Sequence, residues 1–292
     1  MMNRLDGVNC LLMTPFTKQG AIDYDSLNRL INHVINGGVS SIVAMGKIGE
    51  FGVLTMEERR SIMPFVVDRV AGRVPVGFGI INASFDDGLT LGRYAAQAGG
   101  DFVMSRPPVD GDVMDYFIRL TDQIPVMPYD LGEQGELSVH EHILPLVEKT
   151  KNIVGLKISG LPDKVPEAKR LLDIPILCGW DLMSLMEYQL GADGVISGSA
   201  TIIPSDEVQL YKLAKQSLWS EARDIYYPKI LPLLNYCTFD PHAYSVSKYA
   251  LYYQGIIDCP DVREPNPDAG EARAKEVREV LERIGILDPT PA

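Results

Sequence analysis

The sequence predicts an α/β protein, a (β/α)8 TIM barrel with a C-terminal helical extension. Eight short apolar runs alternate with amphipathic stretches, which is the pattern of a parallel sheet that is buried on both faces. The length of 292 residues suits one large barrel. An open, doubly wound sheet is the alternative, but no GxGxxG sequence follows the first apolar run. We therefore expect a closed barrel.

Each predicted strand is a short apolar run, rich in β-branched residues and bounded by charged residues, Gly or Pro. In chain order the runs are 8–13, 41–45, 76–80, 102–104, 126–129, 153–158, 176–178 and 194–196. In such a barrel the C-terminal ends of all strands meet at one face, which carries the active site. The residues that follow each run are therefore the candidates for chemistry.

The stretches between the runs predict the outer helices. Residues 25–35 carry apolar side chains at helical spacing, and Gly37 follows as a stop signal. Residues 55–70 open with Thr55-Met56-Glu57-Glu58, which is a capping-box pattern. Further helices are expected at 86–98, 139–149 and 181–190.

From about Ser205 onward the pattern is only helical. Helices are expected at 208–218, 221–234, 241–253 and 269–284. The first of them would complete a barrel domain that spans 1–220, and 221–292 would form the extension. Because so few residues cannot bury a core alone, we expect the extension to pack on the barrel or on a neighbouring subunit.

The composition excludes several classes of function. The net charge of -12 and the pI near 4.8 argue against nucleic-acid binding and against an anionic membrane surface. The cysteines are widely spaced and imply no disulfide framework, and the first six residues hold no signal-peptide core. We therefore expect a soluble cytoplasmic protein whose partner is a small molecule.

Lys157 is the most informative residue. It closes the apolar run 153–156, where a buried ammonium would cost several kcal/mol unless it were paired or neutral. Burial lowers a lysine pKa, and a neutral lysine amine condenses with carbonyl compounds to form a Schiff base. The sequence therefore indicates covalent carbonyl chemistry, with a strand-end lysine that reaches solvent as the alternative.

Several motifs together resemble the dihydrodipicolinate synthase / N-acetylneuraminate lyase family. Gly46-Lys47-Ile48-Gly49-Glu50, with Leu54-Thr55 and Glu57-Glu58-Arg59 behind it, resembles the family's Gly-x-x-Gly-Glu … Leu-Thr-x-Glu-Glu-Arg signature. Tyr129 precedes Lys157 by the family's usual spacing. Further similarities lie in Thr14-Pro15-Phe16, in Cys178-Gly179-Trp180-Asp181 and in Gly191-Ala192-Asp193-Gly194-Val195-Ile196-Ser197.

The resemblance implies a class I aldolase that acts on pyruvate or a 2-oxo acid derived from it. Lys157 would form the imine, and the Tyr129 hydroxyl would relay protons. Backbone amides of the glycine turn would hold the substrate carboxylate, as consecutive amides in such turns hold anions. The candidate substrate-binding residues are Gly46, Lys47, Ile48, Gly49, Gly179 and Ile196. Arg106 is a further candidate, because a guanidinium can clamp a distal carboxylate, with a surface arginine at a strand end as the alternative. No metal or cofactor is needed, and a homo-oligomer, dimer or tetramer, is expected.

The sequence also departs from the family pattern. Lys47 and Ile48 stand where the family has small hydroxyl-bearing residues, and the loop 105–110 lacks the usual inter-subunit tyrosine. The active site could then be complete within one chain. Gln134 stands where dihydrodipicolinate synthases have an arginine, so we expect a different second substrate from aspartate semialdehyde. Ser159 and Asp181 are candidates for the pocket rim, and we expect Glu50 to hold its turn.

The motifs leave the reaction open. Aldol cleavage or condensation, and dehydration or deamination of a 3-deoxy-2-oxo acid, use the same imine. The missing hydroxyls also allow a binding or regulatory homologue without turnover. A metal-dependent aldolase is disfavoured, because no cluster of His, Asp and Glu follows the predicted strands.

Overall fold

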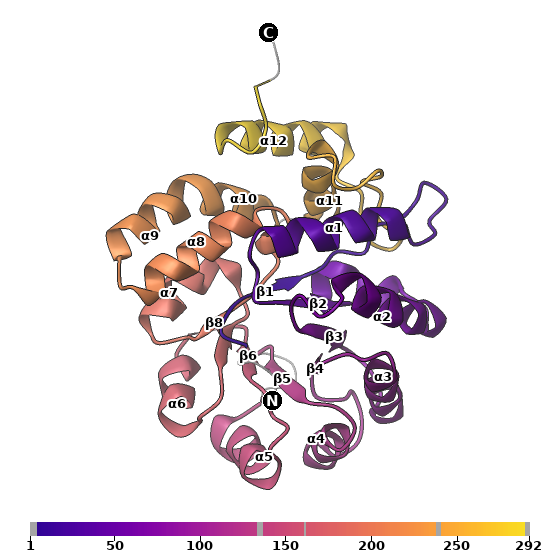
Figure 1. The fold of residues 1–292 in the computed structure, drawn as a ribbon, viewed down its shortest axis with the longest axis vertical. Helices are drawn as coiled ribbons and strands as arrows, with labels where there is room; N and C mark the ends of the chain where they lie inside the picture. The colour runs from indigo at the N-terminus through magenta and orange to yellow at the C-terminus, as the bar shows by residue number, and fades with distance from the viewer. Residues whose placement is uncertain (1–4, 133–136, 161, 238–240, 290–292) are drawn as a thin grey trace.

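Eight parallel strands pair in chain order and close into a barrel, which confirms the predicted fold (Figure 1). The computed structural model describes residues 5–132, 137–160, 162–237 and 241–289. β1 pairs with β8 in parallel, so the sheet has no free edge. The strands are β1 (Gly7–Leu11), β2 (Ser41–Ala44), β3 (Val76–Ile80), β4 (Phe102–Ser105), β5 (Val126–Asp130), β6 (Leu156–Ile158), β7 (Ile176–Cys178) and β8 (Gly194–Ser197).

An outer ring of helices surrounds the barrel (Figure 1). The capping box predicted at Thr55 is present, since its hydroxyl accepts from the Glu58 amide and the Glu58 carboxylate accepts from the Thr55 amide. The sequence patterns did not delimit α4 or α6. The helices of the ring are α1 (Tyr24–Asn36), α2 (Met56–Val70), α3 (Phe85–Gln97), α4 (Val113–Thr121), α5 (Leu144–Lys149), α6 (Lys164–Leu171), α7 (Ser184–Gln189) and α8 (Pro204–Lys215).

β6 is shorter than the predicted run 153–158, because only its second half lies in the ladder with β7. Ile153 forms an isolated bridge with Val126, and the Val154 amide donates to the Val126 carbonyl over 2.9 Å. The apolar residues 153–155 therefore lead into the strand rather than belong to it.

Apolar side chains fill two layers, one between the strands and the helices and one inside the barrel. Tyr129 belongs to the inner layer with residues such as Leu11, Met127 and Leu177. Lys157 is the register partner of Tyr129 across β5 and β6, and partners on neighbouring strands point to the same face of a sheet. Both side chains therefore point into the barrel.

The C-terminal extension packs on its own barrel. Arg29 of α1 donates to the Ile256 carbonyl over 3.0 Å and pairs with Asp258 at 2.6 Å, and α11 and α12 lie beyond α1 in Figure 1. The predicted helix 221–234 is divided by a π-helical turn. The extension consists of α9 (Trp219–Ile225), the turn Tyr226–Ile230, α10 (Leu231–Cys237), α11 (Ala243–Tyr253) and α12 (Gly270–Arg283). Among the described residues, no helix has the length and apolar character needed to cross a membrane.

Candidate active site

A cavity of about 300 Å³ opens at the C-terminal ends of the strands. Its lining combines the strand ends with helices of the extension, since Tyr244 and Ser247 of α11 contribute beside Tyr129 and Lys157. The wall is completed by residues from the turn after β2 and from the ends of β7 and β8, namely Lys47, Ile48, Gly179, Trp180, Asp181, Ile196, Gly198 and Ser199.

Lys157 and Tyr129 form the centre of this cavity. Lys157 is only 2% exposed and Tyr129 only 3%. The Lys157 Nζ atom lies 4.0 Å from the centroid of the Tyr129 ring. An aromatic face attracts a cation at this distance, which stabilises an ammonium in an otherwise apolar interior. The contact also brings a phenol next to a primary amine.

The surroundings change the acidity of Tyr129. Burial raises the pKa of its phenol, but the other groups outweigh burial and the pKa is lowered overall. Lys157 contributes most to this lowering, followed by the Ser159 hydroxyl and then by Lys47 and Arg106. A phenol that releases its proton more readily is better suited to general acid–base catalysis near neutral pH.

The turn after β2 is strained at both ends. Met45 and Glu50 have φ angles of 59° and 54°, although neither is glycine. Left-handed backbone costs such residues about 1–2 kcal/mol each. Between them, Lys47–Gly49 forms a short 3-10 turn. Strain of this kind persists only where the surrounding contacts fix the backbone, and it gathers at functional sites.

Contacts from the first strand hold this turn in place. The Thr14 hydroxyl donates to the Gly49 carbonyl over 2.7 Å. A Cβ atom at Gly49 would lie 2.8 Å from the Leu12 carbonyl oxygen, so only glycine fits there. The motifs at Thr14 and at the glycine turn therefore belong to one structural unit.

Glu50 joins the turn to the extension through a buried ion pair. Its Oε1 atom lies 2.5 Å from the Lys248 Nζ atom of α11, and both side chains are fully buried. Its Oε2 atom accepts from the Asn266 side chain over 2.7 Å and from the Arg263 amide over 3.3 Å. This geometry fits the expectation that Glu50 holds the turn.

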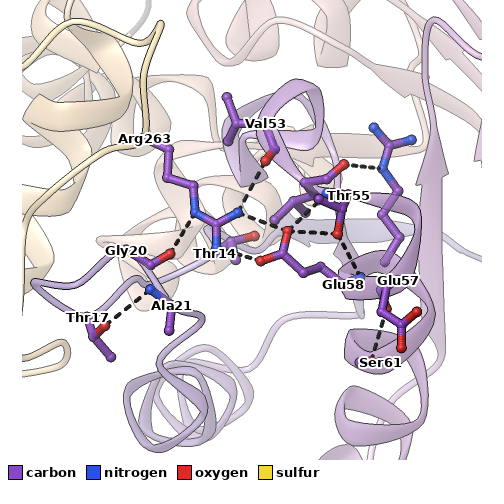
Figure 2. Close-up of polar contacts among 12 residues, drawn as sticks. Thr14, Thr17, Gly20, Ala21, Val53, Thr55, Glu57, Glu58, Ser61 and Arg263 are labelled. Atoms are coloured by element: carbon purple, nitrogen blue, oxygen red, sulfur yellow. Dashed lines mark hydrogen bonds and ion pairs between the residues drawn. The ribbon is translucent and has the colours of Figure 1, made fainter.

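Arg263 adds a second connection between the extension and the barrel (Figure 2). Its guanidinium pairs with Glu58 at 2.6 Å and donates to the carbonyls of Gly20, over 2.8 Å, and Val53, over 3.2 Å. The segment after α11 is thereby attached to the start of α2. This attachment holds the extension, whose Tyr244 and Ser247 line the cavity, on the barrel.

The end of β7 approaches β6 closely. A Cβ atom at Gly179 would lie 1.9 Å from the Ser159 Oγ atom, so this position needs glycine. The chain then reaches Asp181, whose Oδ2 atom accepts from the amides of Gly198 and Ser199, each over 2.8 Å. Asp181 thus organises the loop after β8 at the edge of the cavity.

The structure brings most of the predicted site residues together. Lys157, Tyr129, Lys47, Ile48, Gly179 and Ile196 all line the cavity. Gly46 and Gly49 shape the backbone of the turn. Arg106 lies outside the cavity lining and donates to the Asn82 side chain over 2.9 Å. Gln134 lies outside the described residues.

Sequence patterns missed the contribution of α11. Tyr244 and Ser247 lie far along the chain, in a helix that was assigned to an appendage. Burial raises the pKa of Tyr244, and its proximity to Glu50 and Tyr129 raises it further. The one available signal was Lys248, a charged residue next to the apolar positions of that helix, which indicated a buried partner.

Comparison with known proteins identifies the family. The sequence model described as "Dihydrodipicolinate synthetase family" matches residues 4–284. The chain belongs to this family. It is therefore an enzyme, a lyase of the class I aldolase type, and at family level a pyruvate-dependent Schiff-base lyase.

Relatives in the dihydrodipicolinate synthetase family cover the whole chain. A 4-hydroxy-tetrahydrodipicolinate synthase of Methanococcus aeolicus is 31% identical over 97% of this chain and 100% of its own. The crystal structure of dihydrodipicolinate synthase from Aquifex aeolicus has 27% identity and a TM-score of 0.87, with 96% and 98% of the two chains covered. A prophage protein of the family from E. coli K12, solved in complex with pyruvate, has 25% identity and a TM-score of 0.87. The match covers 97% of this chain and 99% of that protein's chain.

These relatives bear on the expected second substrate. The expectation that the chain is not a dihydrodipicolinate synthase finds no support among them, because the curated relatives carry the name 4-hydroxy-tetrahydrodipicolinate synthase. That expectation rested on Gln134, which lies outside the described residues.

Proposed function

We propose that Lys157 forms an imine with pyruvate or with a pyruvate-derived 2-oxo acid. The observation that carries the proposal is the buried Lys157 amine against the Tyr129 ring, inside a cavity large enough for a small acid. A lysine enclosed in this way is shielded from water, which protects an imine from hydrolysis. The pyruvate complex of the E. coli K12 relative supports the choice of substrate.

The turn after β2 would hold the substrate carboxylate. Lys47 and Ile48 line the cavity at the start of the 3-10 turn, where the first amides of any helix lack intrahelical partners. The Lys47 ammonium adds a positive charge. Gly46 and Gly49 allow the close approach of the backbone, and Gly179 and Ile196 line the cavity from the ends of β7 and β8. Arg106 would act only on a larger acid, through a change in its side-chain position.

The Tyr129 phenol would move protons to and from the imine and the bond being made or broken. Its lowered pKa and its place beside Lys157 suit this role. The names of the curated relatives favour carbon–carbon bond formation or cleavage as the reaction. Dehydration or deamination of a 3-deoxy-2-oxo acid would use the same imine and is the second candidate.

Reductive trapping tests the proposal. Pyruvate and sodium borohydride should add one pyruvate-derived group per chain, and peptide mass mapping should find it on Lys157. Lys157→Met should abolish the adduct, whereas the control Lys169→Met, which removes a lysine paired with Asp193, should leave it unchanged. An adduct on another lysine, or none in the wild type, would refute the assignment.

We also propose that the protein is a homo-oligomer, a dimer or a tetramer, as the resemblance to the family suggests. Light scattering of the purified chain would measure its mass in solution. A mass of one chain at micromolar concentration would contradict this proposal.

A further inference from the structure

Two buried carboxyl groups meet through one hydroxyl beside the cavity. The Ser199 Oγ atom lies 3.0 Å from the Oδ2 atom of Asp181 and makes a very short contact with the Oε1 atom of Glu207 on α8. Glu207 is fully buried, and Asp181 is 9% exposed. Asp181 and Ser199 line the cavity, whereas Glu207 lies behind them.

The number of available protons restricts this arrangement. The Ser199 hydroxyl has one proton and can donate to only one of the two carboxyl groups. The other contact is a hydrogen bond only if the second carboxyl group carries a proton of its own. Whichever way the hydroxyl points, Asp181 and Glu207 therefore share one acidic proton.

The local contacts place that proton on Glu207. Burial raises the pKa of Asp181, but its Oδ2 atom accepts two backbone N–H bonds, which favour its ionised form, as does the charge of Lys157. The Glu207 Oε2 atom has no hydrogen-bond partner among the described residues. Burial raises the pKa of Glu207, the negative charge of Asp181 raises it further, and it reaches about 8.

Other titratable groups lie near the pair, and none that the structure describes is a cation that acts on Glu207. Tyr188 and Tyr226 feel the charges of both Glu207 and Asp181, and burial raises the pKa of each of these phenols. Lys157 is the cation that acts on Asp181. Cys10, Cys178 and Asp206 also lie near the pair.

The order of the strands puts Tyr129 and the carboxyl pair on either side of Lys157. Around the barrel, Tyr129 on β5 precedes Lys157 on β6, and Asp181 follows β7. Two proton-carrying groups therefore flank the lysine. We propose that Asp181, Ser199 and Glu207 form a proton-sharing relay, in which Asp181 exchanges the proton of the substrate carbon next to the imine and Glu207 stores it.

The proposed step balances in atoms and charge, and it rests on the imine at Lys157 proposed above. The positive imine nitrogen favours the doubly ionised pair. Asp181 takes a proton from the methyl carbon, and the C–H electrons form the new C=C bond while the C=N electrons return to nitrogen. The nitrogen loses its positive charge, the pair loses one negative charge, and Ser199 shares the new proton between the two carboxyl groups. Glu207 acts through the others and is a positioning residue.

Exchange of the pyruvate methyl protons in D2O tests the relay without any second substrate. Proton NMR would measure the exchange rate from the loss of the methyl signal. This rate is divided by the fraction of enzyme in the imine form, which borohydride trapping gives. The wild-type rate should rise with pH with its midpoint near pH 8 and level off above about pH 9, because Glu207 must be ionised to store the proton. Glu207→Gln should still trap pyruvate, lack this rise and be about a hundredfold slower at pH 8.

Two further variants keep the test decisive. Ser199→Ala breaks the link while both carboxyl groups remain, so it should lose the same pH dependence even if Glu207→Gln fails to fold. Glu187→Gln is the matched control. Burial raises the pKa of Glu187 to about 7, but its carboxylate has no contact with Ser199, so exchange should stay at the wild-type rate. Exchange within threefold of the wild type in both relay variants would overturn the proposal.

Infrared difference spectroscopy of the free protein separates this inference from the proposed function. Titration should remove a protonated-carboxyl band with a midpoint near pH 8 in the wild type and in Glu187→Gln. Glu207→Gln should lack this band and lose only the band of Glu187, near pH 7. If the Glu207 band is missing from the wild type, the shared proton is refuted. If the band is present but pyruvate is never trapped, the imine assignment fails while the shared proton stands.

Discussion

Substitution of Lys248 tests whether the extension stabilises the barrel through one buried ion pair. The Lys248 ammonium lies 2.5 Å from Glu50, donates to the Asp261 carbonyl over 2.9 Å, and lies 4.0 Å from the centroid of the Phe16 ring. Lys248→Met keeps most of the side-chain volume but removes the charge. The Glu50 carboxylate would then remain buried without its cation.

The expected loss is about 3–5 kcal/mol of unfolding free energy, which is the usual cost of leaving one charge of a buried pair uncompensated. We expect the lower end of this free-energy range, because Asn266 and the Arg263 amide still donate to the other Glu50 oxygen. The turn after β2 should also loosen, since Glu50 holds its left-handed end. A higher pyruvate concentration should therefore be needed to convert half of the enzyme to the imine.

Urea unfolding followed by circular dichroism would measure the stability, and borohydride trapping the pyruvate affinity. The control is Lys275→Met on α12. The Lys275 side chain is 79% exposed, and its ammonium lies 3.9 Å from Glu279. It should change stability by no more than about 0.5 kcal/mol. The double variant Lys248→Met/Glu50→Gln should recover part of the loss, because no ionised group stays unpaired. A loss below about 1 kcal/mol in Lys248→Met would refute the reasoning.

Three further predictions concern the pocket and the Arg263 connection. Tyr129→Phe should still trap pyruvate but form the imine about a hundredfold more slowly; an unchanged rate in stopped-flow trapping would exclude the proton relay. Lys47→Ala removes one of the cations that lower the pKa of Tyr129, so that pKa should rise and imine formation should move to higher pH; a pH profile identical to the wild type would contradict this. Arg263 lowers the pKa of Glu58 from 4.5 to about 2. The ion pair therefore stabilises the folded protein above pH 4.5, and this stabilisation is lost as the pH falls to about 2. Glu58→Gln should therefore be less stable than the wild type at pH 7 and equally stable near pH 2 by urea unfolding, and an equal deficit at both values would rule out the ion pair as the cause.

The sequence predicted the barrel because its signals are local. Each strand is an apolar run between breakers, and the Thr55 capping box marks the start of α2 within four residues. The helices α4 and α6, of nine and eight residues, were not delimited, although the stretches that hold the shorter helices α5 and α7 were. The division of 221–234 by a π-helical turn has no sequence signal that we recognise.

Lys157 could be predicted because it is a charged residue in an apolar run, and Tyr129 because its spacing before Lys157 resembles that of the family. The structure then showed that the two residues are register partners on β5 and β6, so that both side chains point into the barrel. Their chemistry follows from the residue types themselves. The glycine turn was predicted for a similar reason, since its conformation depends on Gly46 and Gly49 within a few residues.

Tertiary structure alone decided what surrounds them. Glu207 had an ordinary place in the first turn of a helix, where acidic residues are common, and only folding brings it to Ser199 and Asp181. In the same way, Tyr244 and Ser247 reach the cavity because the extension folds back over the barrel. The sequence by itself determined the barrel and the place of Lys157 in it, because local patterns set both. The proton-sharing pair and the contribution of α11 to the cavity depend on contacts between distant segments, which no local pattern encodes.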